Sequence, residues 1–98
     1  MTSRRILYSG PARQDLDEIW DYIAANNPIA ASKFIDKKIL KACQSYANQP
    51  RLGEARFDLM PDCRHFSVGQ YVIYYRPVVD GIELIRILHG ARSVDNLQ

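Results

Sequence analysis

Two tight turns divide residues 63–92 into three short segments. Asp80-Gly81 is a strong signal for a two-residue β-hairpin loop, because both central positions of a type I′ turn need a positive φ. Gly69-Gln70 is a second loop of this kind, with glycine in the first central position of a type II′ turn. Together the two turns predict three antiparallel strands and the register in which they pair.

This register assigns each side chain to one face of the predicted sheet. Arg64 lies opposite Tyr75, and Tyr75 lies opposite Arg86. One face then carries Arg64, Phe66, Val68, Tyr71, Ile73, Tyr75, Leu84, Arg86 and Leu88. The other carries Cys63, His65, Ser67, Val72, Tyr74, Arg76, Ile85, Ile87 and His89. Both faces mix apolar, aromatic and cationic groups, so we expect helices on one face and something else on the second.

The residues before the hairpins predict a strand and two helices. Residues 5–9 form the strand, which we expect to pair antiparallel with one edge of the sheet. Gly10-Pro11 begins the first helix, because proline suits the first helical position. Its apolar residues recur at helical spacing: Ala12, Leu16, Ile19, Trp20 and Ile23. Asn27 and Pro28 begin a second helix, with asparagine as the N-cap.

An irregular connector over residues 50–62 completes the predicted fold. Leu52, Phe57 and Leu59 within it are expected to pack back against the core. The element order predicts a single α+β domain over residues 1–98, β-α-α-β-β-β, with an antiparallel sheet packed against a two-helix hairpin.

Composition is that of an ordinary soluble globular protein, with 47% hydrophobic and 24% charged residues. No apolar run reaches the roughly eighteen residues that a membrane span needs. The apolar stretch in residues 1–8 is too short for a secretory signal, so we expect a cytoplasmic protein. Cys43 and Cys63 stand apart from metal-ligand spacings and are expected to be buried small hydrophobes.

Charge is unevenly distributed, although the net charge is only +2. Residues 12–22 are acidic, with Asp15, Asp17, Glu18 and Asp21. Residues 33–41 are basic, with Lys33, Lys37, Lys38 and Lys41. A basic stripe can meet nucleic acid or an acidic protein. We prefer the simpler interpretation of a solvated helix face paired with the acidic helix beside it.

Two groups of side chains are candidates for chemistry. The row Arg64–Tyr75–Arg86 is either a clamp for phosphate or carboxylate, or a structural arrangement in which each guanidinium stacks on the ring and binds an acidic residue of the first helix. We favour the structural arrangement. His65 and His89 are potential general acids or bases, but no carboxylate or cysteine partner is placed beside them.

No Gly-rich phosphate loop, metal-ligand cluster or nucleophile elbow occurs in the sequence, so neither cofactor nor metal is expected.

From about Arg5 to Asp95 the chain resembles members of the ParE branch of the ParE/RelE superfamily. These proteins are the toxins of bacterial type II toxin–antitoxin modules. The matching positions, in order, are Ala12, Asp15-Leu16, Ile19-Trp20, Tyr22-Ile23, Asn27-Pro28, Ala31, Phe34, Pro50, Gly53, Arg56, Leu59, Pro61, Arg64, Tyr71–Tyr75-Arg76, Asp80-Gly81 and Arg86-Ile87-Leu88-His89-Gly90-Ala91-Arg92. No single position is diagnostic, but the set is specific in this order and spacing.

The resemblance implies one of two activities. RelE-like members resemble ribosome-dependent messenger RNA endonucleases with a basic cluster on the sheet and an aromatic residue near the tail. The basic positions fall on His65, Ser67 and Val72 here, the tail aromatic falls on Gln98, and only Arg92 is a basic match. Cleavage of RNA without a metal needs cations to stabilise the developing charge. An endoribonuclease with a rebuilt site of His65, His89 and Arg92 is therefore our second hypothesis.

The ParE branch implies a toxin that inhibits DNA gyrase by binding it, without catalytic residues of its own. Its implied partner is a ParD-like antitoxin whose disordered C-terminal tail folds over the toxin. Neither membrane association nor sequence-specific nucleic-acid binding is expected. A third hypothesis is a toxin-like fold that binds its partner but is no longer toxic. We expect partner contact on one predicted face of the sheet near the tail, at His65, Tyr74, Arg76, His89 and Arg92.

Overall fold

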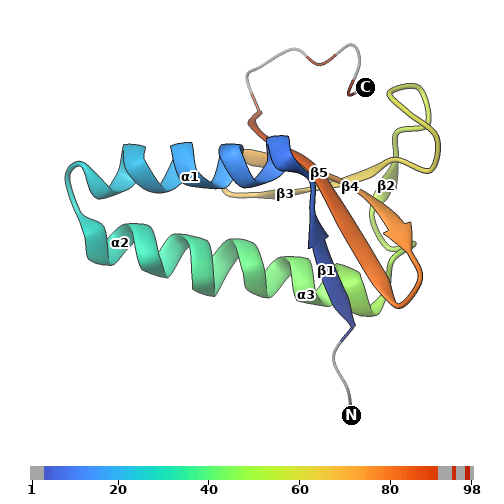
Figure 1. Cartoon of the computed structure of the whole chain (residues 1–98), viewed down its shortest axis with the longest axis horizontal. Coiled ribbons are helices and arrows are strands. Elements are labelled where there is room, and N and C mark those ends of the chain that lie inside the picture. Colours follow the sequence, from blue (N-terminus) through green and yellow to red (C-terminus); the bar gives the residue numbers. More distant parts are fainter. Residues whose placement is uncertain (1–3, 91–93, 95–96, 98) are drawn as a thin grey trace.

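The computed structural model describes residues 4–90 together with Val94 and Leu97. One five-stranded sheet has the order β1-β5-β4-β3-β2. The strands are β1 (Arg5–Tyr8), β2 (Glu54–Ala55), β3 (Arg64–Val68), β4 (Tyr71–Val78) and β5 (Gly81–His89). Helix α1 (Gly10–Ala24) runs antiparallel to a second helical rod made of α2 (Pro28–Lys33), η1 (Phe34–Ile39) and α3 (Leu40–Asn48) (Figure 1). The expected α+β class and helical hairpin are confirmed.

Both helical rods begin at capping residues. Ser9 Oγ accepts a hydrogen bond from Ala12 N at 3.0 Å and donates one to the Ile85 carbonyl at 2.8 Å, so the cap also ties α1 to the sheet. Asn27 Oδ1 accepts from Ala30 N at 3.1 Å, as the N-cap prediction requires.

A π-helical segment, η1, interrupts the second rod and carries part of the basic stripe. Lys33, Lys37, Lys38 and Lys41 are all exposed, as expected for a solvated face. The expected pairing with the acidic helix is wrong, because within residues 4–90 none of these lysines forms an ion pair with α1.

The first hairpin has the predicted register and the second does not. Gly69 has a φ of +58°, and β3 pairs with β4 so that Arg64 lies opposite Tyr75. In the second hairpin Val78 pairs with Gly81, so the two loop residues are Val79 and Asp80. Tyr75 consequently lies opposite Leu84 and not Arg86.

Edge strand β1 explains why Gly81 belongs to the strand. β1 pairs in parallel with β5, placing Arg5 beside Gly81, whereas we expected an antiparallel edge. Arg5 N donates to the Asp80 carbonyl at 2.7 Å. A Cβ on residue 81 would collide with the Arg5 carbonyl oxygen, so only glycine permits this close approach.

A bulge in β5 changes the face on which its last residues lie. Tyr74 pairs with Arg86 and Tyr75 with Leu84, which leaves Ile85 without a partner in β4. Beyond the bulge, Ile87 packs with the helix-side core and Leu88 packs on the opposite side, the reverse of the predicted faces.

The connector contributes the short strand β2, which pairs antiparallel with β3 at the other edge of the sheet. Leu59 is buried as expected. Leu52 and Phe57 are 60% and 57% exposed, so the expectation that they pack into the core is wrong.

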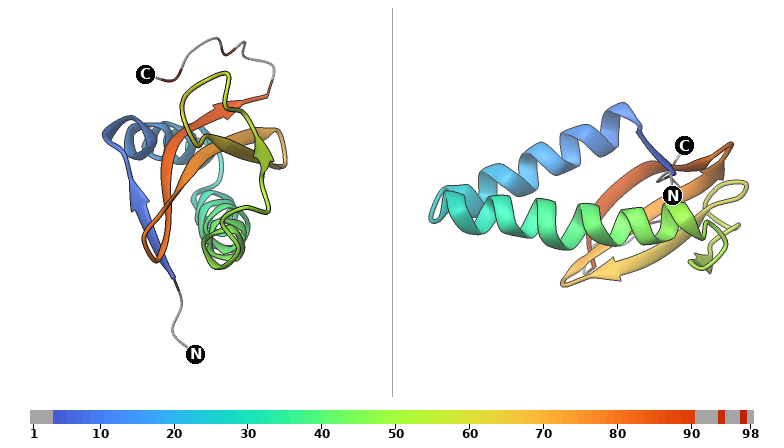
Figure 2. Two further views of the ribbon diagram at one scale, coloured as in Figure 1. Left: turned by 90° about the vertical axis from the view of Figure 1, so that its right-hand side faces the viewer. Right: turned by 90° about the horizontal axis from the view of Figure 1, so that it is seen from below.

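Two hydrophobic clusters lie on opposite faces of the sheet. The helix-side cluster contains Ala12, Ile19, Ile39, Cys43, Ala47, Phe66, Ile73, Tyr75, Ile82, Leu84 and Ile87. The far-side cluster contains Leu59, Cys63, Tyr74, Ile85 and Leu88, with Met60, Val72, Val94 and Leu97 packed against it. Figure 2 shows the connector crossing the sheet on the side away from the helical rods. Both cysteines are buried and free, as predicted.

No helix in the described part of the chain is long and apolar enough to cross a membrane.

Candidate functional site

Arg86 is held by an acidic residue of α1. Its Nε and Nη2 donate to Asp15 Oδ2 and Oδ1 at 2.7 and 3.0 Å, and the Ile87 amide donates to the same carboxylate at 2.8 Å. The hydrogen bond with Asp15 raises the pKa of Arg86. Asp15 is buried on α1 and Arg86 lies on β5, so this ion pair joins the helix to the sheet. The predicted binding of an acidic residue of the first helix is confirmed for Arg86, but the predicted position of Arg86 opposite Tyr75 is wrong, because Leu84 lies there.

Arg64 and Tyr75 organise the connector. The Tyr75 hydroxyl donates to the Pro50 carbonyl at 2.8 Å and accepts from Gly53 N at 2.9 Å, and burial raises the pKa of Tyr75. Arg64 Nη1 donates to the carbonyls of Arg51 and Gly53 at 3.2 and 2.8 Å. The guanidinium of Arg64 lies over the Phe57 ring at 5.5 Å, so the expected stacking on Tyr75 is wrong.

Three of the predicted contact residues lie on the far face of the sheet. His65 stacks on Tyr74 with ring centroids 5.7 Å apart, and its Nε2 is 3.3 Å from Glu54 Oε2. Its Nδ1 is buried and has no hydrogen-bond partner among the residues that the structure describes. Arg76 Nε donates to Glu83 Oε1 at 2.7 Å across the strands. Tyr74 is buried in the far-side cluster, so it presents little surface to a partner.

His89 does not join this group, because the β5 bulge places it on the helix side. Its ring meets Tyr71 edge-on at 5.8 Å, and its Nε2 is 3.1 Å from Gln70 Oε1. A cavity of about 200 Å³ beside it is also lined by Asp15 and Tyr22. The prediction that His65 and His89 share a face is wrong. Arg92 lies outside the described residues, and partner contact at all five positions stays a prediction.

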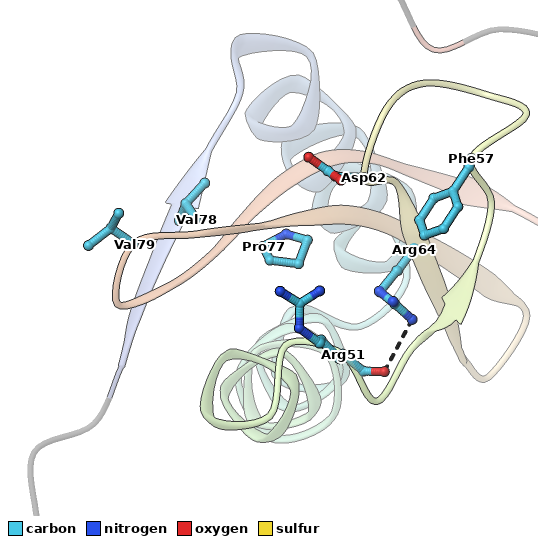
Figure 3. A pocket seen from close by; sticks show the side chains of 7 residues that line it. All are labelled: Arg51, Phe57, Asp62, Arg64, Pro77, Val78 and Val79. Atoms are coloured by element: carbon cyan, nitrogen blue, oxygen red, sulfur yellow. Dashed lines mark hydrogen bonds between the residues drawn. The ribbon is translucent and has the colours of Figure 1, made fainter.

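A second concave site was not predicted from the sequence. A cavity of about 440 Å³ lies where the connector meets the β4–β5 hairpin, and we call it the arginine groove (Figure 3). Its lining residues are Arg51, Phe57, Asp62, Arg64, Pro77, Val78 and Val79. The sequence signal for this site is Arg51 and Phe57 in the connector followed by Arg64, but the prediction places Phe57 in the core.

The positions that correspond to a RelE-type basic cluster carry little positive charge. His65 is placed against the Glu54 carboxylate, Ser67 is exposed and uncharged, and Val72 packs against the far-side cluster.

Neither a metal centre nor a reactive thiol is found in the described part of the chain. No group of three or more His, Cys, Asp or Glu there could hold a metal ion. Burial raises the pKa of Cys43 to about 12 and that of Cys63 to about 11. Neither thiol is therefore a thiolate nucleophile near neutral pH.

Comparison with known proteins identifies the family to which this arrangement belongs. The family model of the ParE toxin of the type II toxin–antitoxin system, parDE, matches residues 6–94. The chain belongs to the ParE toxin family. The match runs from β1 through all helices and strands to the residues after β5.

Relatives of known name agree with this assignment. Toxin ParE1 of Mycobacterium tuberculosis is 31% identical over 94 residues, which cover 95% of this chain and 96% of the relative. Toxin ParE3 of Caulobacter vibrioides is 30% identical over 90 residues, which cover 92% and 90%. The chain is thus a ParE-family toxin of a type II toxin–antitoxin system.

Two solved structures share the fold. The chromosomal ParDE toxin–antitoxin system from P. aeruginosa matches with a TM-score of 0.63 and 26% identity, covering 89% of this chain and 96% of the other. The RelBE2 toxin–antitoxin complex from Mycobacterium tuberculosis matches with a TM-score of 0.58, 20% identity, and coverage of 90% and 99%. The second similarity is one of fold alone.

Proposed function

We propose that this toxin inhibits DNA gyrase by binding it, and that a ParD-like antitoxin neutralises it. The observation that carries the proposal is the family match over residues 6–94, whose description names a parDE system. A structural neighbour at 26% identity supports an antitoxin partner, because it is the chromosomal ParDE toxin–antitoxin system from P. aeruginosa.

The charge distribution on the far face of the sheet also supports inhibition by binding. Metal-independent cleavage of RNA needs cations free to stabilise the negative charge of the transition state. Arg76 is engaged by Glu83, Arg56 by Asp58, and His65 is placed against Glu54. Beside these residues lie the apolar side chains of the far-side cluster and the uncharged Ser67. Such a surface is better suited to contact with a protein than to phosphoryl chemistry.

The predicted contact residues enter this proposal in two roles. His65 and Arg76, which remain partly exposed, contact the partner directly. Tyr74 acts as a positioning residue, since it is buried and stacks on His65. His89 contacts the partner from the helix side of the sheet, and Arg92 contacts it near the C-terminal tail.

A supercoiling assay with purified gyrase tests the proposal. We expect the toxin to block supercoiling at concentrations comparable to that of the enzyme, and the toxin already bound to its antitoxin to have no effect. Primer extension on translated messages, run in parallel, should show no discrete cuts. Cuts in the ribosomal A site with supercoiling unaffected would establish the endoribonuclease hypothesis instead.

A further inference from the structure

The arginine groove joins segments that are distant in the sequence. The connector supplies Arg51, Phe57 and Asp62, the start of β3 supplies Arg64, and the end of β4 with its loop supplies Pro77, Val78 and Val79. Its volume of about 440 Å³ falls within the range of about 300–1,000 Å³ typical of ligand pockets. Because Phe57 and Val79 are 57% and 78% exposed, the groove is open to solvent.

Two guanidinium groups make this groove cationic. Figure 3 shows the side chains of Arg51 and Arg64 pointing into the space between Phe57 and the two valines. Both hydrogen bonds made by the Arg64 guanidinium use Nη1, so its Nε and Nη2 remain able to donate. Within residues 4–90 the Arg51 side chain makes no hydrogen bond or ion pair, and Arg51 is exposed. Asp62 is the single acidic residue in the lining.

Apolar surface surrounds these cations. Phe57 and Val79 are large hydrophobic side chains with most of their area exposed, and Pro77 and Val78 lie beside them. Arginine binds carboxylates through paired N–H donors. Covering exposed apolar side chains with a partner lowers the free energy of the complex. The combination is complementary to a carboxylate that stands next to an apolar side chain.

We propose that the arginine groove binds an extended segment of the antitoxin in which an acidic residue neighbours an apolar one. The carboxylate meets Arg51 and Arg64, and the apolar side chain covers Phe57 and Val79. This inference rests on the proposed function, from which it takes the antitoxin as partner. A disordered segment places individual side chains into a space of this size, whereas a folded partner contacts a broad surface.

Charge and apolar variants of the groove test the proposal. Arg51→Glu and Phe57→Ser change exposed side chains, so both proteins should fold, which circular dichroism and thermal unfolding will verify. Lys37→Glu makes the same charge change on the exposed face of η1, and Ile29→Ser removes an apolar side chain that is 70% exposed on α2. These are the matched controls. Affinity for the antitoxin encoded in the same operon is measured by calorimetry at low and high salt.

Both groove variants should bind the antitoxin about tenfold or more weakly than the wild type, a loss of about 1.4 kcal/mol or more. The controls should stay within about twofold, a difference of about 0.4 kcal/mol. The loss caused by Arg51→Glu should shrink at high salt, because the contact is partly electrostatic.

Unchanged antitoxin affinity of both groove variants would overturn the inference while leaving the proposed function intact. If the groove variants keep their antitoxin affinity but no longer inhibit gyrase, the groove binds gyrase and the inference is wrong. If the wild type binds the antitoxin through the groove yet fails to inhibit gyrase, the inference stands and the gyrase proposal fails. If the wild type does not bind the antitoxin, both fail.

Discussion

The two faces of the sheet are stabilised in different ways. On the helix side, a large apolar cluster surrounds directional contacts made by Asp15 and Tyr75. On the far side, a smaller cluster is covered by the connector and by Val94 and Leu97, and its polar contacts lie at its margins. The helix side thus combines the larger apolar cluster with buried hydrogen bonds, whereas the interior of the far side is held mainly by apolar contact.

This difference separates the surface that maintains the fold from the surfaces available to partners. Buried, hydrogen-bonded charges have few alternative arrangements, because leaving one of them unpaired costs several kcal/mol. Apolar contacts under an irregular connector can rearrange at lower cost. We therefore expect the helix side to tolerate little change, and the far side and the arginine groove to be the places where family members adapt to their partners.

Removing the Asp15 carboxylate should cause the largest loss of stability. Asp15→Ala leaves Arg86 and the Ile87 amide without their acceptor, and we expect the free energy of unfolding to fall by about 4 kcal/mol. Urea denaturation measures this change, and Asp17→Ala on the exposed side of α1 is the control. A double variant, Asp15→Leu with Arg86→Met, should recover part of the loss. Equal losses for Asp15→Ala and Asp17→Ala would remove the distinction between the two faces.

Cavities on the two faces should differ in cost. Ile73→Ala on the helix side should lower the free energy of unfolding by about 3 kcal/mol, because helices and sheet cannot close around the space. Leu59→Ala on the far side should cost about 2 kcal/mol, since the connector that carries it can move inward. The same urea experiment compares the two. A greater loss for Leu59→Ala would show that the connector is as rigid as the helices.

The smallest expected effect on the free energy of unfolding comes from the two cysteines, one in each cluster. Burial raises the pKa of Cys43 to about 12 and that of Cys63 to about 11, from a usual value of 9.0. Above pH 9 the unfolded chain loses thiol protons that the folded chain keeps, so stability falls as pH rises. Each thiol should contribute about 1 kcal/mol of this fall between pH 9 and pH 10.

Urea denaturation at pH 9 and pH 10 measures that slope. Cys43→Ala and Cys63→Ala should each remove about half of the fall that is due to the thiols, although the two residues lie on opposite faces. A variant that keeps the full wild-type slope would show that its thiol is not protected by burial.

Elements that depend on neighbouring residues were predicted correctly. Pro11 and Asn27 marked the beginnings of the helical rods, and Gly69 marked the first hairpin and its register. Each signal acts within a few positions along the chain. The Gly69 turn also placed His65 opposite Tyr74 on one face of the sheet, so this part of the candidate site was predictable as well.

The errors in the second hairpin have causes that are distant in sequence. Strand β1 lies so close to Gly81 that this glycine is required in the strand and not in the loop. The Asp15 carboxylate accepts the Ile87 amide beside the bulge, across a separation of 72 residues. The bulge then moved His89 to the helix side. The arginine groove was missed because Arg51, Phe57 and Val79 come from segments whose meeting no local pattern encodes.

The amino-acid sequence by itself determined the order of the main elements, although not the short strand β2, together with the α+β class and the membership of the ParE toxin family. Caps, the Gly69 turn and apolar periodicity depend on adjacent residues, whereas the Asp80-Gly81 turn was shifted by one residue through its contact with β1. The tertiary structure alone decided which residues share a face, because a single unpaired residue in β5 reverses every side chain beyond it. It also created the groove, since a concave surface exists only after distant segments have packed together.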